Sequence, residues 1–166
     1  MNLSVPALEW ARRLVRINTV SRESNLPLID CIADHLRALN VPIRLTYDDE
    51  RRKANLFATI GASKPDGVIL SGHTDTVPWD GQDWTLDPLG AEVRDGKLYG
   101  RGSADMKAYI GLVVAQTERF LAADAPHAIH YAFTYDEETG CFGVPRLIAD
   151  FRDARLAPTR CLVGEP

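Results

Sequence analysis

Apolar residues recur every three or four positions in several segments of the chain, which is the spacing of one face of an α-helix. The predicted helices include or span Leu8–Val15, Leu26–Leu39, Ala108–Leu121 and Val144–Phe151. Ser4 and Pro6 suit the start of the first helix, and Asn40 suits the end of the second. The pattern thus predicts four amphipathic helices that each bury one face.

Shorter apolar runs predict five strands. They are Ile43–Tyr47, Asn55–Ile60, Val68–Leu70, Ile129–Thr134 and Arg160–Val163. The first two are expected to pair as a hairpin, and Ser63–Gly67 reads as a turn before the third. Because strands alternate with helices over the second half, the fold class is α/β with a mixed or mainly parallel sheet.

The segment from residue 76 to 103 breaks this alternation. It is rich in Gly, Pro, Asp and Trp, and Asp95-Gly96 predicts a small hairpin inside it. A loop of this length in a compact domain usually has a function.

Composition narrows the class of protein. The 166 residues carry a net charge of −4 and no long basic run, which argues against nucleic acid or an anionic membrane as the main partner. The first helix mixes Glu9 and two arginines with its apolar residues, unlike a signal peptide, and no apolar run approaches the ~20 residues of a membrane span. Cys31, Cys141 and Cys161 read as reduced thiols, so a cytoplasmic location is expected.

Acidic and imidazole groups follow the ends of three predicted strands. His73 and Asp75 follow Val68–Leu70, the run Asp136-Glu-Glu138 follows Thr134, and Glu165 follows Val163. Ligands of α/β sheets gather outside the carboxyl ends of the strands. Asp105 lies between a Gly-rich turn and a long predicted helix, so its carboxylate could reach the same edge.

Each of these residues alone has an ordinary explanation. His73 could be a surface or capping residue, Asp105 the N-cap of its helix, Glu137 and Glu138 a solvated turn, and Glu165 a residue without a role. Together they favour a site for zinc, cobalt or manganese. One glutamate of the adjacent pair could bind metal while the other takes a proton from water, which suits hydrolysis of an amide or ester.

Several other side chains could have either a functional or a structural role. Cys141 could bind metal or act as a nucleophile, although a small buried thiol is the favoured reading. Arg101 and Lys107 could bind a substrate carboxylate, or form structural ion pairs or exposed charges. Three aromatic residues could line a substrate pocket or pack the long loop onto the sheet: Trp79, Trp84 and Tyr99.

Four motifs in order resemble the di-zinc peptidase/deacylase family, which includes acetylornithine deacetylase and succinyl-diaminopimelate desuccinylase. They are Ser71–Pro78 (SGHTDTVP), Gly100–Lys107 (GRGSADMK), Asp136–Gly140 (DEETG) and Gly164–Pro166 (GEP). The resemblance covers essentially the whole chain, and it is greatest to the acetylornithine deacetylase branch. It implies a three-layer zinc-exopeptidase-like domain with a central mixed, mainly parallel sheet flanked by helices.

The resemblance also implies roles for individual residues. His73, Asp105 and Glu165 resemble the ligands of one zinc ion, and Asp105, as a bridge, and Glu138 resemble ligands of a second. Glu137 resembles the general base, and Asp75 resembles the residue that orients His73. A cis peptide bond would fall between Asp105 and Met106. The implied substrate is a small N-acylated amino acid, and the implied activity is removal of the acetyl group from N2-acetylornithine. The alternatives are the desuccinylase, a metallo-dipeptidase or carboxypeptidase, or a non-catalytic fragment.

Two features of that family have no match here. One is a late histidine that completes the second zinc site, and neither His35, His127 nor His130 suits that role. The other is a smaller inserted domain used for dimerisation and substrate contacts. Residues 1–166 are therefore expected to be the N-terminal part of the catalytic domain, weakly active or inactive alone, from a protein that is a homodimer when complete.

Overall fold

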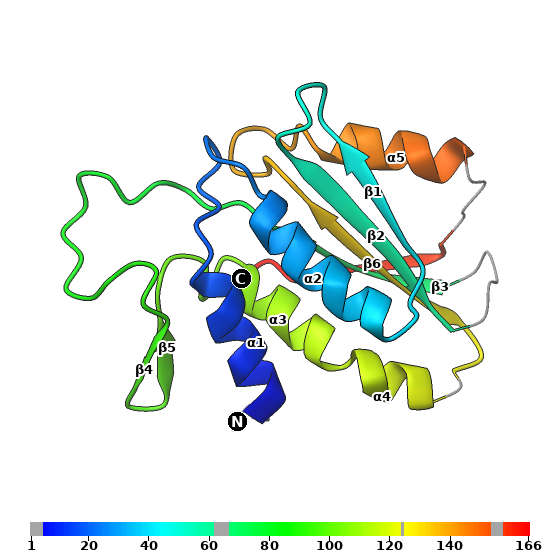
Figure 1. The fold of residues 1–166 in the computed structure, drawn as a ribbon, viewed down its shortest axis with the longest axis horizontal. Helices are drawn as coiled ribbons and strands as arrows, with labels where there is room; N and C mark the ends of the chain where they lie inside the picture. The colour runs from blue at the N-terminus through cyan, green and yellow to red at the C-terminus, as the bar shows by residue number, and fades with distance from the viewer. Residues whose placement is uncertain (1–4, 62–66, 124, 154–157) are drawn as a thin grey trace.

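A computed structural model describes the chain except for residues 1–4, 62–66, 124 and 154–157 (Figure 1). Ser4 and most of the turn predicted at Ser63–Gly67 lie outside the described residues. The remaining segments form a sheet with helices on both faces. The α/β class predicted from the alternation of strands and helices is confirmed.

The sheet contains five strands in the order β1-β2-β6-β3-β7. Their bounds are Ile43–Tyr47 (β1), Ala54–Ile60 (β2), Gly67–His73 (β3), Ala128–Thr134 (β6) and Arg160–Val163 (β7). β1 and β2 form the predicted antiparallel hairpin, β2 is antiparallel to β6, and β3 is parallel to both β6 and β7. The sheet is therefore mixed, and only β2 runs against the other strands.

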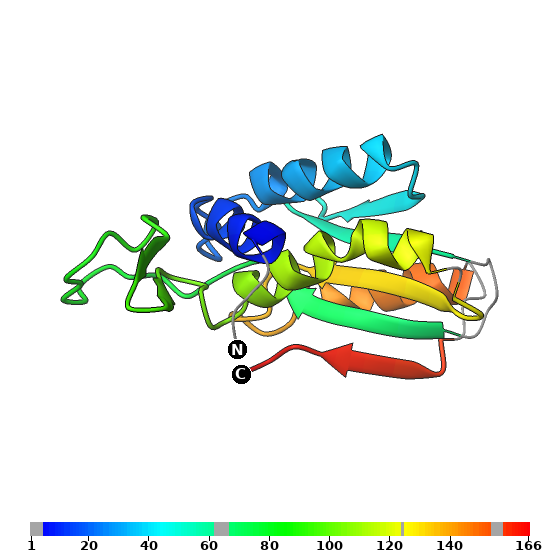
Figure 2. The same cartoon turned by 90° about the horizontal axis from the view of Figure 1, so that it is seen from below.

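Helices cover the two faces unequally. Those on one face are α1 (Val5–Val15), α2 (Leu26–Ala38), α3 (Lys107–Ala115) and α4 (Thr117–Ala122). The opposite face carries α5 (Val144–Asp153), so the molecule has three layers (Figures 1 and 2). Alternation along the strands explains this arrangement, since neighbouring residues point to opposite faces. Leu56 lies in the large core under α1–α3, whereas the adjacent Phe57 packs with Leu147 of α5.

The predicted helix Ala108–Leu121 is in fact two helices, α3 and α4, separated at Gln116. The Thr117 hydroxyl donates to the Val114 carbonyl at 2.7 Å and lies 3.0 Å from the Tyr131 hydroxyl. A threonine side chain that bonds the preceding turn competes with the helical backbone pattern. Apolar periodicity continues through such a break, so the pattern alone does not reveal it.

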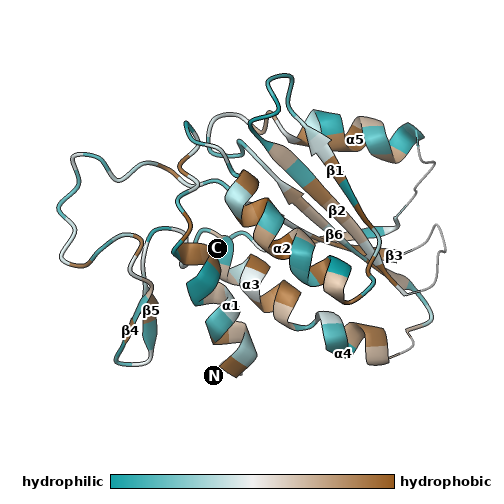
Figure 3. Cartoon of the chain, viewed as in Figure 1, coloured by the Kyte–Doolittle hydropathy of each residue, from teal (hydrophilic) through white to brown (hydrophobic). Residues whose placement is uncertain are grey.

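The helix α3 is the most hydrophobic helix and is packed against α1 and the sheet (Figure 3). Gly111 makes the close approach to α1 possible, because a Cβ there would lie 2.6 Å from the Ala11 backbone nitrogen. At the end of α2, Asn40 adopts φ 57°, the left-handed conformation that ends many helices. No helix in the described part of the chain has the length and apolar character needed to cross a membrane.

The long loop after residue 76 extends away from the sheet and contains the predicted hairpin, β4 (Glu92–Arg94) and β5 (Lys97–Tyr99) (Figure 1). Asp95 and Gly96 both have positive φ, as the turn of such a hairpin requires. Trp84 contacts two residues of the loop itself. The Arg101 guanidinium carbon lies 5.1 Å from the centroid of the Trp84 ring, and the indole N–H donates to the Gln82 side chain. This aromatic residue therefore packs within the loop.

Candidate metal centre

The register of the parallel strands brings the predicted site residues to one edge of the sheet. His73 is the last residue of β3 and lies opposite Thr134 of β6, while Ser71 lies opposite Val163 of β7. The Asp136–Glu138 segment leaves β6 and Glu165 leaves β7 at that same edge. This placement was predicted from the strand ends.

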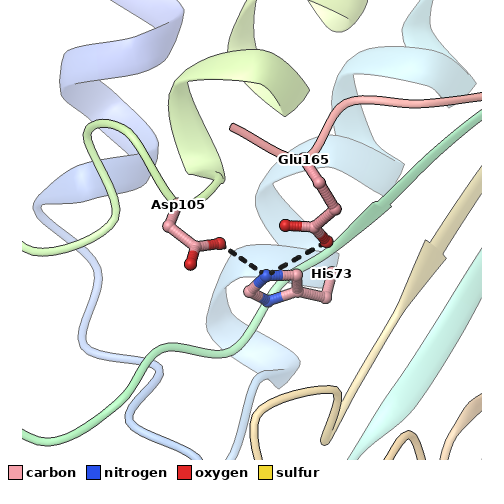
Figure 4. A group of neighbouring side chains, drawn as sticks. All are labelled: His73, Asp105 and Glu165. Carbon is pink, nitrogen blue, oxygen red and sulfur yellow. Dashed lines mark hydrogen bonds and ion pairs between the residues drawn. The ribbon is translucent and has the colours of Figure 1, made fainter.

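Three of the predicted ligands form a cluster. One ligand atom each from His73, Asp105 and Glu165 lie within 4.8 Å of one another (Figure 4). The Nε2 atom of His73 is 2.8 Å from Asp105 Oδ1 and 3.6 Å from Glu165 Oε1. The imidazole is buried, whereas both carboxylates are partly exposed, so the cluster opens to solvent on its carboxylate side.

Local backbone features position the two carboxylates. Asp105 immediately precedes α3, and the peptide bond between Asp105 and Met106 is cis, as predicted. The Met106 sulfur accepts the His73 backbone N–H at 3.2 Å, which links the start of α3 to the end of β3. Glu165 follows Gly164, which crosses the Tyr109 ring so closely that a Cβ would lie 2.3 Å from it. The Gly164 N–H also donates to the Ser71 carbonyl at 3.2 Å.

Asp75 contacts the His73 ring through its backbone carbonyl more closely than through its carboxylate. The Nδ1 atom of His73 lies 2.9 Å from the Asp75 backbone carbonyl and 3.5 Å from the carboxylate oxygen Oδ1. The carbonyl therefore takes the hydrogen bond, which leaves Nε2 directed at the carboxylates of the cluster. The turn after β3 folds this carbonyl back under the ring, a detail that residue spacing does not specify.

The Asp75 carboxylate is held by donors from two other segments. Oδ2 accepts from the Ser21 hydroxyl at 2.7 Å and from the Glu138 N–H at 3.3 Å, and Oδ1 accepts from the Glu137 N–H at 3.1 Å. Burial alone would raise the pKa of Asp75, but the nearby His73 ring and the hydrogen bonds from Ser21 and Glu137 outweigh burial and lower it. The carboxylate is thus a buried anion with satisfied acceptors.

Glu137 and Glu138 border the cluster. Glu138 is outside the group of three whose ligand atoms lie together, but its pKa is raised by burial and then by the negative charge of Asp105. Glu137 Oε1 lies 3.7 Å from the Cys141 sulfur, and the charge of Glu137 helps to raise the pKa of Glu165, after burial and Asp105. Both glutamates are therefore close enough to interact electrostatically with the carboxylates of the cluster.

The electrostatics of this cluster fit a metal cation. Burial lowers the pKa of His73, but the neighbouring carboxylates of Asp75, Asp105 and Glu165 raise it to about 9. Burial and then the charge of Asp105 raise the pKa of both Glu138 and Glu165, because the neighbouring carboxylates repel one another. One imidazole and several carboxylates are donors that zinc, cobalt and manganese accept.

The structure decides the environment of two other candidates. Cys141 is exposed, which contradicts the favoured prediction of a buried thiol, because it lies in a turn with φ 60° after Gly140. Lys107 is fully buried, which excludes the exposed charge among its predicted alternatives. It is the first residue of α3, its Nζ donates to the Ile17 carbonyl at 2.7 Å, and burial lowers its pKa to about 7.

The remaining histidines stay away from the cluster, as expected. His35 lies 4.8 Å from the Trp10 ring on the helical side. His130 is buried in β6 opposite Ile69, with Nδ1 3.0 Å from the Thr59 hydroxyl. His127 lies beside a cavity lined by Gly67, at the start of β3 rather than its end.

Sequence reasoning missed the polar residues that support the site. Ser21 and Lys53 lie in segments that read as ordinary polar loops. Lys53 Nζ nevertheless contacts both the Ser21 carbonyl and the Asp136 carboxylate. Spacing along the chain gives no signal for such contacts, which join residues 32 and 83 positions apart.

The chain is similar in sequence to known proteins. The model of "Peptidase family M20/M25/M40" matches residues 69–166. Over its whole length the chain is 34% identical to acetylornithine deacetylase of Proteus mirabilis and 33% identical to that of Photorhabdus laumondii. The chain spans 44% of the length of each of these relatives.

Solved structures share the fold. Human carnosine dipeptidase 1 matches 96% of this chain with a TM-score of 0.81 at 22% identity, over 38% of its own length. An M20 family metallo-carboxypeptidase of Sulfolobus solfataricus matches 97% with a TM-score of 0.78 at 16% identity, over 37% of its own length. The predicted zinc-exopeptidase-like fold is confirmed. The chain therefore belongs to peptidase family M20/M25/M40.

Proposed function

We propose that this chain supplies part of the active site of an amidohydrolase that removes the acetyl group from N2-acetylornithine, giving ornithine and acetate, as arginine biosynthesis requires. The observation that carries the hydrolase proposal is the cluster of His73, Asp105 and Glu165 at the sheet edge. The choice of substrate is supported by the names of the relatives that match the whole chain.

We propose that His73, Asp105 and Glu165 hold one zinc ion, and that Asp105 and Glu138 contribute to a second, with cobalt or manganese as substitutes. When bound, zinc supplies Lewis-acid chemistry: it polarises a carbonyl oxygen and lowers the pKa of a water ligand toward ~7. The Asp75 carbonyl accepts from Nδ1 of His73, which turns the ring so that Nε2 faces the proposed zinc position.

Glu137 is the proposed general base. Its carboxylate takes a proton from water as the water oxygen bonds to the acetyl carbon, and it passes the proton to the amine nitrogen as the C–N bond breaks. Its backbone N–H is tied to Asp75, so the base is fixed relative to His73. The second water proton also passes to the nitrogen, so the products are acetate and an ammonium group, and one water accounts for all atoms.

We further propose that the chain is the N-terminal part of a catalytic domain, since it spans 44% of its relatives. On this proposal a further histidine and a dimerisation domain come from the rest of the protein. The 166 residues alone should then turn over little acetylornithine with added zinc, and turnover near ~10 s⁻¹ would contradict this. The cytoplasmic location and the homodimer stay predictions.

The test uses the complete protein encoded by the reading frame. Its metal content is measured, and hydrolysis of N2-acetylornithine is compared with that of N-succinyl-diaminopimelate and of a dipeptide. Glu137→Gln should keep the metal and lose about 10²–10⁴-fold in rate, as loss of a general base does. Glu118→Gln, on the exposed side of α4, is the control and should keep full activity.

Each outcome of this test is informative. A preference for the succinyl substrate or the dipeptide would replace the proposed substrate while keeping the hydrolase. Full activity in Glu137→Gln would remove the general-base role. Absence of both bound metal and hydrolysis would leave the non-catalytic alternative.

A further inference from the structure

We propose that Ser21 is a positioning residue of the candidate metal centre: its hydroxyl fixes the Asp75 carboxylate against the Glu137–Glu138 backbone and thereby keeps Asp75 under His73. The effect on metal binding rests on the proposed function. Ser21 lies between α1 and α2, more than fifty residues before the nearest candidate ligand in the sequence.

The hydrogen bonds of the Asp75 carboxylate show why one hydroxyl matters. Both backbone donors, Glu137 N–H and Glu138 N–H, come from the turn after β6. The Ser21 hydroxyl comes from a different segment, and its 2.7 Å bond to Oδ2 is the shortest of the three. A carboxylate held only by the β6 turn would follow any movement of that turn. Ser21 therefore ties Asp75 to a second part of the fold.

The Ser21 backbone is fixed independently of its side chain. Its N–H donates to the Thr76 carbonyl at 3.1 Å, and the Thr76 N–H donates to the Thr19 carbonyl at 3.0 Å. Its carbonyl accepts from Lys53 Nζ, which also pairs with Asp136 at the start of the glutamate turn. Because the backbone contacts remain when the hydroxyl is removed, Ser21→Ala should leave the loop in place. It should remove the hydrogen bond from the hydroxyl to the Asp75 carboxylate.

A conservative variant can restore the contact. Ser21 lines a cavity of about 190 Å³ together with Val77 and Glu138, so the methyl group of threonine has space beside it. Ser21→Thr keeps a hydroxyl donor, whereas Ser21→Ala has none. A residue with a merely structural role in the loop would not distinguish these two variants by their effect on the metal.

The experiment measures zinc affinity of the complete protein encoded by the reading frame, by competition with a chromophoric chelator, alongside its unfolding free energy in urea. Ser21→Ala should bind zinc about tenfold more weakly, the loss typical when a partner of a metal-binding histidine is disturbed. Ser21→Thr should bind like the wild type. The matched control is Ser24→Ala, in the same loop, because the Ser24 hydroxyl donates to the Arg52 carbonyl and not to Asp75.

Wild-type affinity in Ser21→Ala, or an equal loss in Ser24→Ala, would overturn the proposal. If Ser21→Ala fails to fold, Ser21→Val, which has the shape of Ser21→Thr without the hydroxyl donor, gives the same comparison. If the wild type binds no zinc while remaining folded, the proposed metal site fails and the Ser21 role fails with it. Zinc binding by the wild type therefore shows whether the proposed metal site fails or only the proposed role of Ser21 fails.

Discussion

The candidate site has two halves that differ in how they are held. The buried half is His73 and Asp75, whose side chains are 1% and 3% exposed. The exposed half is Asp105 and Glu165, whose side chains are 48% and 43% exposed. Donors from two other segments hold the buried Asp75 carboxylate, whereas the Asp105 carboxylate is paired with another member of the cluster, His73, at 2.8 Å.

The fold itself stabilises the charge of the buried half, whereas the charges of the exposed half are left for a bound cation to stabilise. Asp75 is a buried anion whose pKa is lowered by its hydrogen bonds, which indicates an environment already arranged for the charge. Glu165 has a raised pKa, because burial and the neighbouring Asp105 and Glu137 disfavour its charged form. A cation would offset that repulsion. We therefore expect substitutions in the buried half to affect folding, and those in the exposed half to affect metal binding.

The largest effect is expected for Asp75→Ala. It leaves the Ser21 hydroxyl and the Glu137 and Glu138 N–H groups without their acceptor in a buried site, and each unsatisfied group costs about 1–3 kcal/mol. The unfolding free energy of the metal-free chain in urea should fall by about 3 kcal/mol or more. Asp83→Ala, in the exposed loop, is the control and should change it little. An equal result for the two variants would show that the buried half is not held as described.

The next effect concerns pH. Zinc binds neutral imidazole, so below pH 9 it must displace the proton that the carboxylates hold on His73, whose pKa is about 9. Zinc affinity should therefore rise about tenfold per pH unit between pH 7 and 9 and then level off. Competition with a chelator of known pH dependence measures this slope. His35→Gln, at a histidine outside the cluster, should keep it, and a flat profile would contradict the raised pKa of His73.

The smallest effect is expected for Glu165→Gln without metal. The substitution removes a partly exposed charge that its neighbours repel, so the unfolding free energy should change by no more than about 0.5 kcal/mol. With zinc added, the wild type should gain stability and the variant should gain much less. Urea unfolding with chelator and with zinc measures both. A large loss of unfolding free energy in the presence of chelator would show that Glu165 stabilises the metal-free fold, as the buried half does.

The fold could be predicted where it depends on local pattern. Alternation in Leu56 and Phe57 distinguishes the two faces of the sheet, and the apolar face of Leu26–Leu39 marks a helix that ends before Asn40. The break at Gln116 could not be predicted, because a contact between Thr117 and Tyr131 of another element accompanies it. The exposure of Cys141 and the burial of Lys107 likewise depend on which segments lie over them.

The sequence by itself determined the motifs, the strand ends at which His73, Glu137 and Glu165 stand, and hence the edge of the sheet where they meet. This is possible because parallel strands deliver their carboxyl ends to one edge whatever the details of packing. Only the tertiary structure decided that Ser21 and the Glu137–Glu138 backbone hold Asp75, and that the Asp75 carbonyl, at 2.9 Å, orients the imidazole. Hydrogen bonds between distant segments require their atoms to be placed to within a fraction of an ångström, and the packing of the whole domain sets those positions.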